Sequence, residues 1–159
     1  AEIARLQVGK TGALISFAAE AGAILAGADR APLARYAAAL GLAFQIVDDL
    51  LDFIGEQSAV GKPLGSDLLQ GLVTLPAIYY AEMNPDHPDV RSLAAGGWGD
   101  HERMERLVQT IRASNATQKA MREAEQCVER AIACLAPFGD CQERAALENL
   151  ARYVVDRKI

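Results

Sequence analysis

Long blocks rich in alanine and leucine, separated by short segments that hold glycine and proline, constrain this chain more than any other feature. Of its 159 residues, 30 are alanine and 18 are leucine, against 22 that are β-branched (Ile, Val and Thr). Alanine and leucine favour helices, whereas β-branched residues lose side-chain freedom in them. Aromatic residues, which favour strands, make up only 6%. The sequence therefore predicts an all-α fold.

Glycine, proline and capping residues divide the chain into a series of predicted helices. The first is rich in small residues, so that neighbouring backbones can approach it closely. Ser66 or Asp67 is a candidate cap of the third helix, which Pro76 should kink or break near its start, and Asp100 is a candidate cap of the fifth. A polar linker at 84–99 holds the short fourth helix. The predicted ranges are 3–27, 32–54, 66–83, 90–95, 100–113, 114–135 and 142–156.

Composition excludes several classes of protein. A hydrophobic fraction of 51% excludes a disordered chain, and a net charge of −5 with a pI near 5.0 argues against nucleic acid as a partner. The longest nearly uncharged run is too short for a membrane span, and no secretory signal is visible. Cys127, Cys134 and Cys141 form no CxxC pair, which predicts reduced thiols in a cytoplasmic protein. His87 and His101 are expected on the surface.

The acidic residues are concentrated in the more apolar part of the chain. Residues 1–99 hold six basic and eleven acidic side chains, whereas residues 100–159 hold ten of each. The centre of the excess is the segment FQIVDDLLDF, residues 44–53. At about 100° per residue, Asp48, Asp49 and Asp52 fall within roughly a 100° arc of one helix face. Gln45 lies in the same arc, one turn earlier.

Three carboxylates on one apolar helix need an explanation, because like charges at this spacing destabilise a helix. A divalent cation would supply the missing counter-charge. Carboxylates without histidine or cysteine suit Mg²⁺, which takes one or two of them and completes its shell with water and phosphate oxygens. The alternative is a solvated acidic patch on a helix edge. The apolar surroundings of the DDxxD pattern favour the metal site.

Two lysines flank this pattern along the chain. Lys10 begins the apolar stretch of the first predicted helix, and Lys62 lies in the glycine-rich segment 55–71. Such a segment can fold over a ligand and bring a lysine to a phosphate as a point charge. Alone, each lysine is typical of an ordinary surface residue or a flexible loop. Together with the carboxylates they predict a site for Mg²⁺ and a diphosphate.

The motifs KTGALISFAAEAGA (10–23), FQIVDDLLDF (44–53) and GKPLGSDLLQGLVTLP (61–76) resemble the second half of the trans-isoprenyl (polyprenyl) diphosphate synthases. Residues 150–157 are also similar to the terminal helix of that family. The resemblance implies an antiparallel helical bundle, part of an isoprenoid-synthase-type fold, usually in a homodimer. It also implies that residues 1–159 form the C-terminal portion of a polyprenyl synthase domain, without the N-terminal helices that carry the first aspartate-rich motif.

The resemblance assigns roles to individual residues. Asp48, Asp49 and Asp52 match the second aspartate-rich motif, which holds Mg²⁺ against the allylic diphosphate. Lys10 and Thr11 match the KT pair of the family, in which the lysine contacts that diphosphate.

Two further matches complete the implied site. Gln45 matches the glutamine that faces the reacting end of the substrates, and Lys62 matches the loop lysine that closes over the diphosphate. The implied activity is that of a Mg²⁺-dependent prenyltransferase. It would condense an allylic prenyl diphosphate with isopentenyl diphosphate to give a longer all-trans polyprenyl diphosphate, which would pass to a membrane.

The sequence departs from the family pattern in two respects. Leu72 stands where the family often has a second lysine, so one phosphate contact is missing or differently supplied. Because the first motif is expected upstream of Lys10, we expect this chain to be inactive alone. Two alternatives stay open, a non-catalytic helical partner subunit of a prenyl synthase and a terpene cyclase. The sequence of the glycine-rich segment resembles that of medium- or long-chain bacterial synthases more than that of farnesyl diphosphate synthases.

Overall fold

The computed structural model describes residues 11–55 and 64–157, which contain helices, turns and loops but no strand. The prediction of an all-α fold is confirmed. The chain divides into two compact units, unit 1 (Ala1–Val47 and Glu123–Lys158) and unit 2 (Asp48–Arg122 with Ile159). Two helices, α3 (Ala31–Ile54) and α9 (Ala116–Ala133), contribute residues to both units. None of the helices in the described ranges is long and apolar enough to cross a bilayer.

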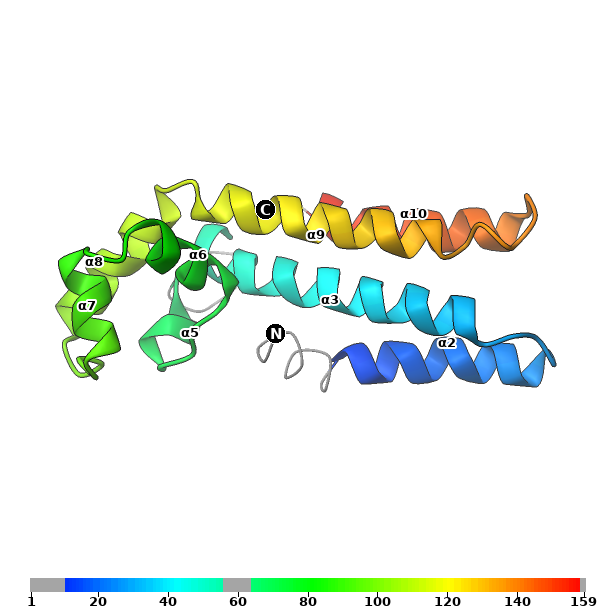
Figure 1. Ribbon diagram of the computed structural model, residues 1–159, viewed down its shortest axis with the longest axis horizontal. Coiled ribbons are helices and arrows are strands. Elements are labelled where there is room, and N and C mark those ends of the chain that lie inside the picture. The colour runs from blue at the N-terminus through cyan, green and yellow to red at the C-terminus, as the bar shows by residue number, and fades with distance from the viewer. Residues whose placement is uncertain (1–10, 56–63, 158–159) are drawn as a thin grey trace. The chain divides into compact units, whose positions relative to one another are not determined.

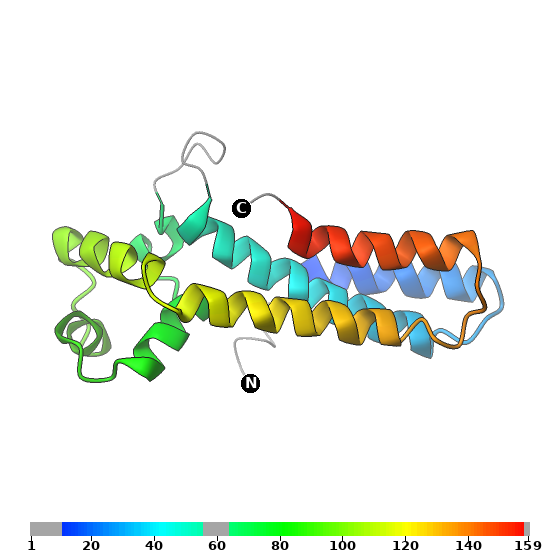
Figure 2. The same ribbon diagram turned by 90° about the horizontal axis from the view of Figure 1, so that it is seen from above.

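Unit 1 contains α2 (Ala13–Leu25), α10 (Gln142–Asp156) and the adjoining parts of α3 and α9. Helices α2 and α3 run antiparallel, as do α9 and α10 (Figures 1 and 2). The bounds of α10 are those predicted from the sequence. Many of the buried residues between these helices are small, which lets the backbones pack closely. The buried residues are Ala23, Tyr36, Ala37, Leu40, Ala43, Ile46, Val47, Ala124, Cys127, Val128, Ala131, Leu135, Ala151 and Val154.

Glycine allows the start of α2 to approach α3 closely. A Cβ atom on Gly41 of α3 would lie 2.7 Å from the Cα atom of Gly12, at the N-cap of α2. No side chain larger than hydrogen fits such a separation. The other end of α2 is closed by Gly27, which has a φ of 64°. The small residues of this helix therefore serve the close approach that the sequence predicts.

Two side chains join α3 to α10 within unit 1. The hydroxyl of Tyr36 donates a hydrogen bond of 2.8 Å to the backbone carbonyl of Leu147. Burial raises the pKa of Tyr36 to about 12. The guanidinium of Arg157 lies 4.3 Å from the centre of the Phe44 ring, a distance typical of a cation–π interaction.

Unit 2 is built around α8 (His101–Arg112), which contacts α5 (Ser66–Leu69), α6 (Leu75–Met83) and α7 (Pro88–Ala94). The predicted cap is confirmed, because the carboxylate of Asp100 accepts a 3.0 Å hydrogen bond from the backbone N–H of Arg103. Four residues of α8 face the core and alternate with charged ones at helical spacing. The buried cluster consists of Phe53, Leu68, Ala77, Tyr80, Met104, Leu107, Val108, Ile111 and Ala116.

The structure has two helices over 66–83, α5 and α6, separated by a loop, which confirms the break predicted at Pro76. Proline explains the break, because Pro76 lies in the first turn of α6 and begins that helix rather than kinking a longer one. The residue at the N-cap of α5 is Gly65, and neither Ser66 nor Asp67 occupies that position.

The prediction that His87 is a simple surface residue also needs correction. His87 is half-buried and is the N-cap of α7, where its Nδ1 atom accepts a 3.3 Å hydrogen bond from the N–H of Asp89. Its ring packs edge-on against Tyr80, with 5.7 Å between the ring centres. His101 is exposed, as predicted. The segment 84–99, predicted as a linker, holds α7 and belongs to unit 2.

Candidate metal and diphosphate site

The three predicted metal-binding aspartates lie on the last turns of α3. Asp48 is exposed, and Asp49 and Asp52 are half-buried. Leu50 and Phe53, which alternate with them, are fully buried. The aspartates therefore lie on the face of α3 opposite its buried residues, as the 100° periodicity predicts.

The carboxylate of Asp52 is directed at α5. The hydroxyl of Ser66 donates a 2.7 Å hydrogen bond to Oδ1 of Asp52, and the backbone N–H of Asp67 donates one of 3.1 Å to Oδ2. The N–H of Gly65 donates a third, of 2.7 Å, to the backbone carbonyl of Asp52. A helix leaves its first N–H groups without partners inside the helix. Gly65 has no side chain to accept from them, so Asp52 of α3 takes that role.

Gly65 lies in a position that only glycine fits. Its φ is 71°, in the left-handed region. A Cβ atom there would overlap Cγ2 of Val108, a buried and stiff side chain of α8. Gly65, within the glycine-rich segment, is therefore fixed on two sides, by Asp52 of α3 and by α8.

The structure brings together two of the other predicted residues. Within unit 1, the amide of Gln45 donates a 3.3 Å hydrogen bond to the hydroxyl of Thr11. Both side chains are half-buried. Gln45 precedes Asp48 and Asp49 by about one turn of the same helix. Lys10 and Lys62 lie outside the described residues.

The aspartates of α3, all within the described residues, offer a metal ion carboxylate oxygens but no preassembled group of three ligands. In the described parts of the chain, no three aspartate, glutamate, histidine or cysteine side chains are arranged to hold one ion together. The carboxylate of Asp52 is bonded to α5, which agrees with the lack of a three-residue group among the described side chains. Mg²⁺ prefers hard oxygen donors and commonly uses only one or two protein carboxylates. The exposed carboxylate of Asp48 and its neighbour Asp49 fit that preference.

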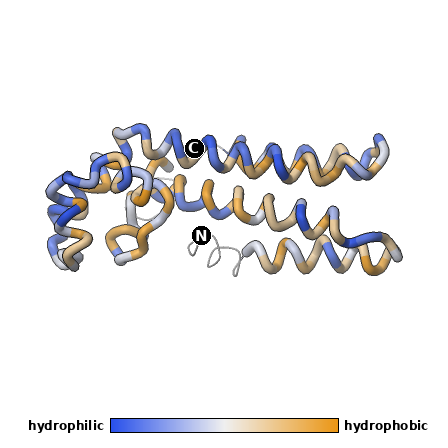
Figure 3. Tube along the Cα trace, in the orientation of Figure 1, coloured by the Kyte–Doolittle hydropathy of each residue, from blue (hydrophilic) through white to orange (hydrophobic). Residues whose placement is uncertain are grey.

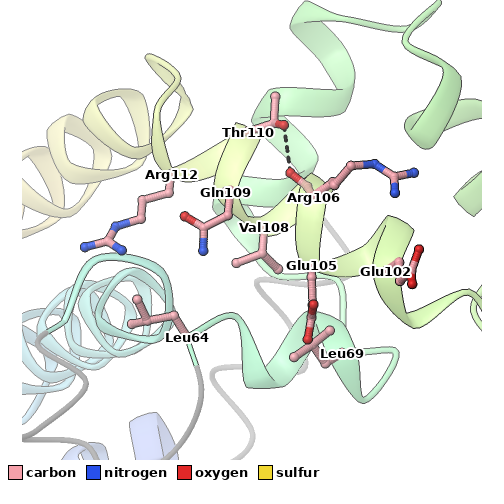
Figure 4. A pocket seen from close by; sticks show the side chains of 9 residues that line it. All are labelled: Leu64, Leu69, Glu102, Glu105, Arg106, Val108, Gln109, Thr110 and Arg112. Carbon is pink, nitrogen blue, oxygen red and sulfur yellow. Dashed lines mark hydrogen bonds between the residues drawn. The ribbon is translucent and has the colours of Figure 1, made fainter.

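A cavity of about 860 Å³ lies elsewhere in unit 2, along α8 (Figure 4). Charges of both signs line it, and the hydroxyl of Thr110 is bonded to the carbonyl of Arg106 at 2.7 Å. Of the residues predicted for the metal or diphosphate site, none that the structure describes lines this cavity. Its lining residues are Leu64, Leu69, Glu102, Glu105, Arg106, Val108, Gln109, Thr110 and Arg112.

Comparison with known proteins identifies the family. The family model described as polyprenyl synthetase matches residues 2–128, well over half of the chain. The chain belongs to the polyprenyl synthetase family. The family predicted from the motifs is therefore confirmed, and so is the helical fold that it implies.

Curated members of the polyprenyl synthetase family match nearly the whole chain. An all-trans-nonaprenyl-diphosphate synthase (geranyl-diphosphate specific) from Rhodobacter capsulatus is 37% identical over 94% of this chain and 46% of its own length. Component 2 of the heptaprenyl diphosphate synthase of Bacillus subtilis is 34% identical over 94% of this chain and 43% of its own. The chain thus spans about half the length of these curated relatives.

Solved structures of polyprenyl synthetases are similar as well. A polyprenyl synthase from Caulobacter crescentus CB15, complexed with calcium and isoprenyl diphosphate, has a TM-score of 0.85 and 34% identity. That match covers 98% of this chain and 49% of the other. The fold of this chain is therefore similar to about half of a polyprenyl synthase.

Sequence reasoning missed one part of the site, the hydrogen bonds between Asp52 and the start of α5. Ser66 was expected to cap a helix and not to bond the third aspartate of the motif. The signal in the sequence is weak. A glycine followed by a serine and an aspartate within a glycine-rich segment indicates a turn into a helix, but it does not show which distant residue accepts from it.

Proposed function

We propose that the complete protein is a Mg²⁺-dependent trans-prenyltransferase. It condenses an allylic prenyl diphosphate with isopentenyl diphosphate and releases a longer all-trans polyprenyl diphosphate. The observation that carries the proposal is the DDxxD face of α3, with Asp48 exposed and Asp52 bonded to α5. Membership of the polyprenyl synthetase family supports it.

Each predicted residue has a task in this proposal. Asp48, Asp49 and Asp52 form the face that would hold Mg²⁺, which supplies positive charge against the departing diphosphate. Lys10 and Lys62 would add positive charge to the same diphosphate.

The allylic carbon loses its bond to the diphosphate oxygen and is attacked by the double bond of isopentenyl diphosphate, after which a proton is lost. Gln45 would face the reacting end of the substrates. Its hydrogen bond to Thr11 supports this task, because it fixes the orientation of the amide.

The test is a chimera with a related enzyme. The half of the Caulobacter crescentus polyprenyl synthase that matches this chain is replaced by it, and incorporation of labelled isopentenyl diphosphate is measured. We expect Mg²⁺-dependent elongation that Asp48→Ala reduces by at least about a hundredfold, and no elongation by this chain alone. A folded, inactive chimera would contradict the proposal, as would normal turnover by the isolated chain.

We also propose that the protein works as a homodimer in the cytoplasm. Helix α2 supports an association surface, because Leu14, Phe17, Ile24 and Leu25 are 61–89% exposed on it. Most of α2 is hydrophobic along its length (Figure 3). The three cysteines are free, in keeping with a reducing compartment. The long apolar product would pass from the enzyme to a membrane.

A second candidate is a non-catalytic partner subunit. The Bacillus subtilis relative is a numbered component of its synthase, and the exposed face of α2 suits a protein partner. Light scattering separates the two proposals. A homodimer doubles the mass of the pure chain, whereas a partner subunit reaches a defined mass only with a catalytic chain present.

A further inference from the structure

The third aspartate of the motif is engaged differently from the first. Asp48 is exposed, whereas Asp52 accepts hydrogen bonds from the start of α5 through both carboxylate oxygens and its backbone carbonyl. We refer to these three hydrogen bonds as the α5 anchor. All of its residues belong to unit 2.

The α5 anchor is buried at Gly65 and Ser66 and half-buried at Asp52 and Asp67. Ser66 is 6% exposed, so its hydroxyl group depends on Asp52 as its partner. A buried hydroxyl without an acceptor destabilises the fold, and hydrogen bonds to a charged group are stronger than neutral ones. These terms favour the observed orientation of Asp52.

The α5 anchor fixes the middle of the glycine-rich segment 55–71, at Gly65 and the start of α5. Gly65 is held by the Asp52 carbonyl on one side and lies against Val108 on the other. The anchor therefore joins that segment to the helix that carries Asp48 and Asp49.

We propose that Asp52 and Ser66 are positioning residues, which serve the Mg²⁺–diphosphate site through the α5 anchor and not by a direct bond from Asp52 to the metal. The inference rests on the proposed function. Asp48 and Asp49 are then the carboxylates of α3 that meet the ion. The substitution of Ser66 tests the anchor without changing any charge.

The experiment combines two measurements on the intact chain. Amide hydrogen exchange is followed at Gly65 and Asp67, and binding of inorganic diphosphate in Mg²⁺ is measured by calorimetry. The variants are Ser66→Ala, Ser66→Thr and Asp52→Asn, with Asp48→Asn for comparison. Ser114→Ala is the matched control, because that half-buried serine also donates a 2.7 Å hydrogen bond in unit 2, to the Ile111 carbonyl.

We expect Ser66→Ala to speed exchange at Asp67 and to weaken diphosphate binding about tenfold, because the start of α5 is then held less firmly against α3. Ser66→Thr, which keeps the hydroxyl, restores binding, and Ser114→Ala leaves it unchanged. Asp52→Asn keeps an acceptor oxygen for the Asp67 N–H. It should therefore lose less affinity than Asp48→Asn.

Three results would overturn the inference. The first is wild-type exchange at Gly65 and Asp67 in Ser66→Ala, and the second is faster exchange with unchanged binding. The third is equal loss of affinity in Asp52→Asn and Asp48→Asn while Asp67 exchange stays slow. Each of these three results contradicts only the positioning role of Asp52 and Ser66. If the wild-type chain binds no diphosphate in Mg²⁺, both the positioning role and the proposed function are contradicted.

Discussion

At the scale of single residues, the site depends on where side chains and glycines meet across helices. The sequence predicts that Asp48, Asp49 and Asp52 share a face of α3, because helical periodicity alone determines that arrangement. It does not predict the hydrogen bond from Ser66 to Asp52, because that contact depends on how a short helix folds back within the glycine-rich segment. The same is true of Gln45 and Thr11, which are 34 residues apart.

Gly65→Ala should destabilise the protein by about 2–5 kcal/mol. The left-handed backbone costs about 1–2 kcal/mol for a residue with a Cβ atom, and overlap with the buried Val108 adds about 1–3 kcal/mol. The free energy of unfolding, measured in urea, checks this. Gly27→Ala is the matched control, because Gly27 has a similar φ but nothing within 4 Å of a Cβ atom. Equal losses in the two variants would show that Val108 is not the cause.

At the scale of helices, the sequence predicts most elements and fails where tertiary contacts decide. The second and last helices are predicted within a residue of α3 and α10, because glycine, proline and capping residues mark their ends. Within 66–83, the break at Pro76 is predicted. The short length of α5 is not predicted, because α5 depends on Asp52 of α3 for its N-terminal partner. Local propensity carries no information about a partner that lies 15 residues earlier in the chain.

Tyr36→Phe should change how stability depends on pH. Burial raises the pKa of Tyr36 to about 12 from its ordinary 10.0, so the folded state favours the neutral phenol. The stability that Tyr36 contributes is present below pH 10 and is lost as the pH rises toward 12. At pH 8 the variant should be about 1 kcal/mol less stable, from the lost hydrogen bond to Leu147. That deficit should shrink above pH 10.

Urea unfolding at several pH values measures this effect. Tyr153→Phe is the control, because Tyr153 is 63% exposed. In both variants the stability still falls in part at alkaline pH because of Tyr80. Burial, and to a smaller extent the charge of Asp89, raise the pKa of Tyr80. A deficit of Tyr36→Phe that stays constant from pH 8 to pH 12 would contradict the role given to the buried phenol.

At the scale of the whole molecule, the order of motifs along the chain predicts the family, and the family model confirms it. The composition, together with the glycines and prolines that separate the helical blocks, predicts the all-α class. What the sequence does not predict is the surface that a helix leaves uncovered. The apolar face of α2 is recognisable only once the structure shows which residues the neighbouring helices bury.

Phe17→Glu should weaken association of the chain. Phe17 is 71% exposed on α2 beside other exposed apolar residues, and burial of such a side chain contributes about 1.5–3 kcal/mol. We expect the association constant to fall about tenfold or more, as measured by sedimentation velocity. Met83→Glu, at a 43% exposed position in unit 2, should leave association unchanged. An equal effect of both substitutions would show that α2 is not the contact surface.

The central claim is that the aspartate face of α3 binds Mg²⁺ together with a diphosphate. The most direct test is calorimetric titration of inorganic diphosphate into the chain, with and without Mg²⁺, for wild type, Asp48→Ala and the control Asp86→Ala, an exposed acid in unit 2. Our account predicts Mg²⁺-dependent heat in the wild type and the control, and a loss of about tenfold or more in affinity for Asp48→Ala. Equal heats and affinities in all three proteins would contradict it.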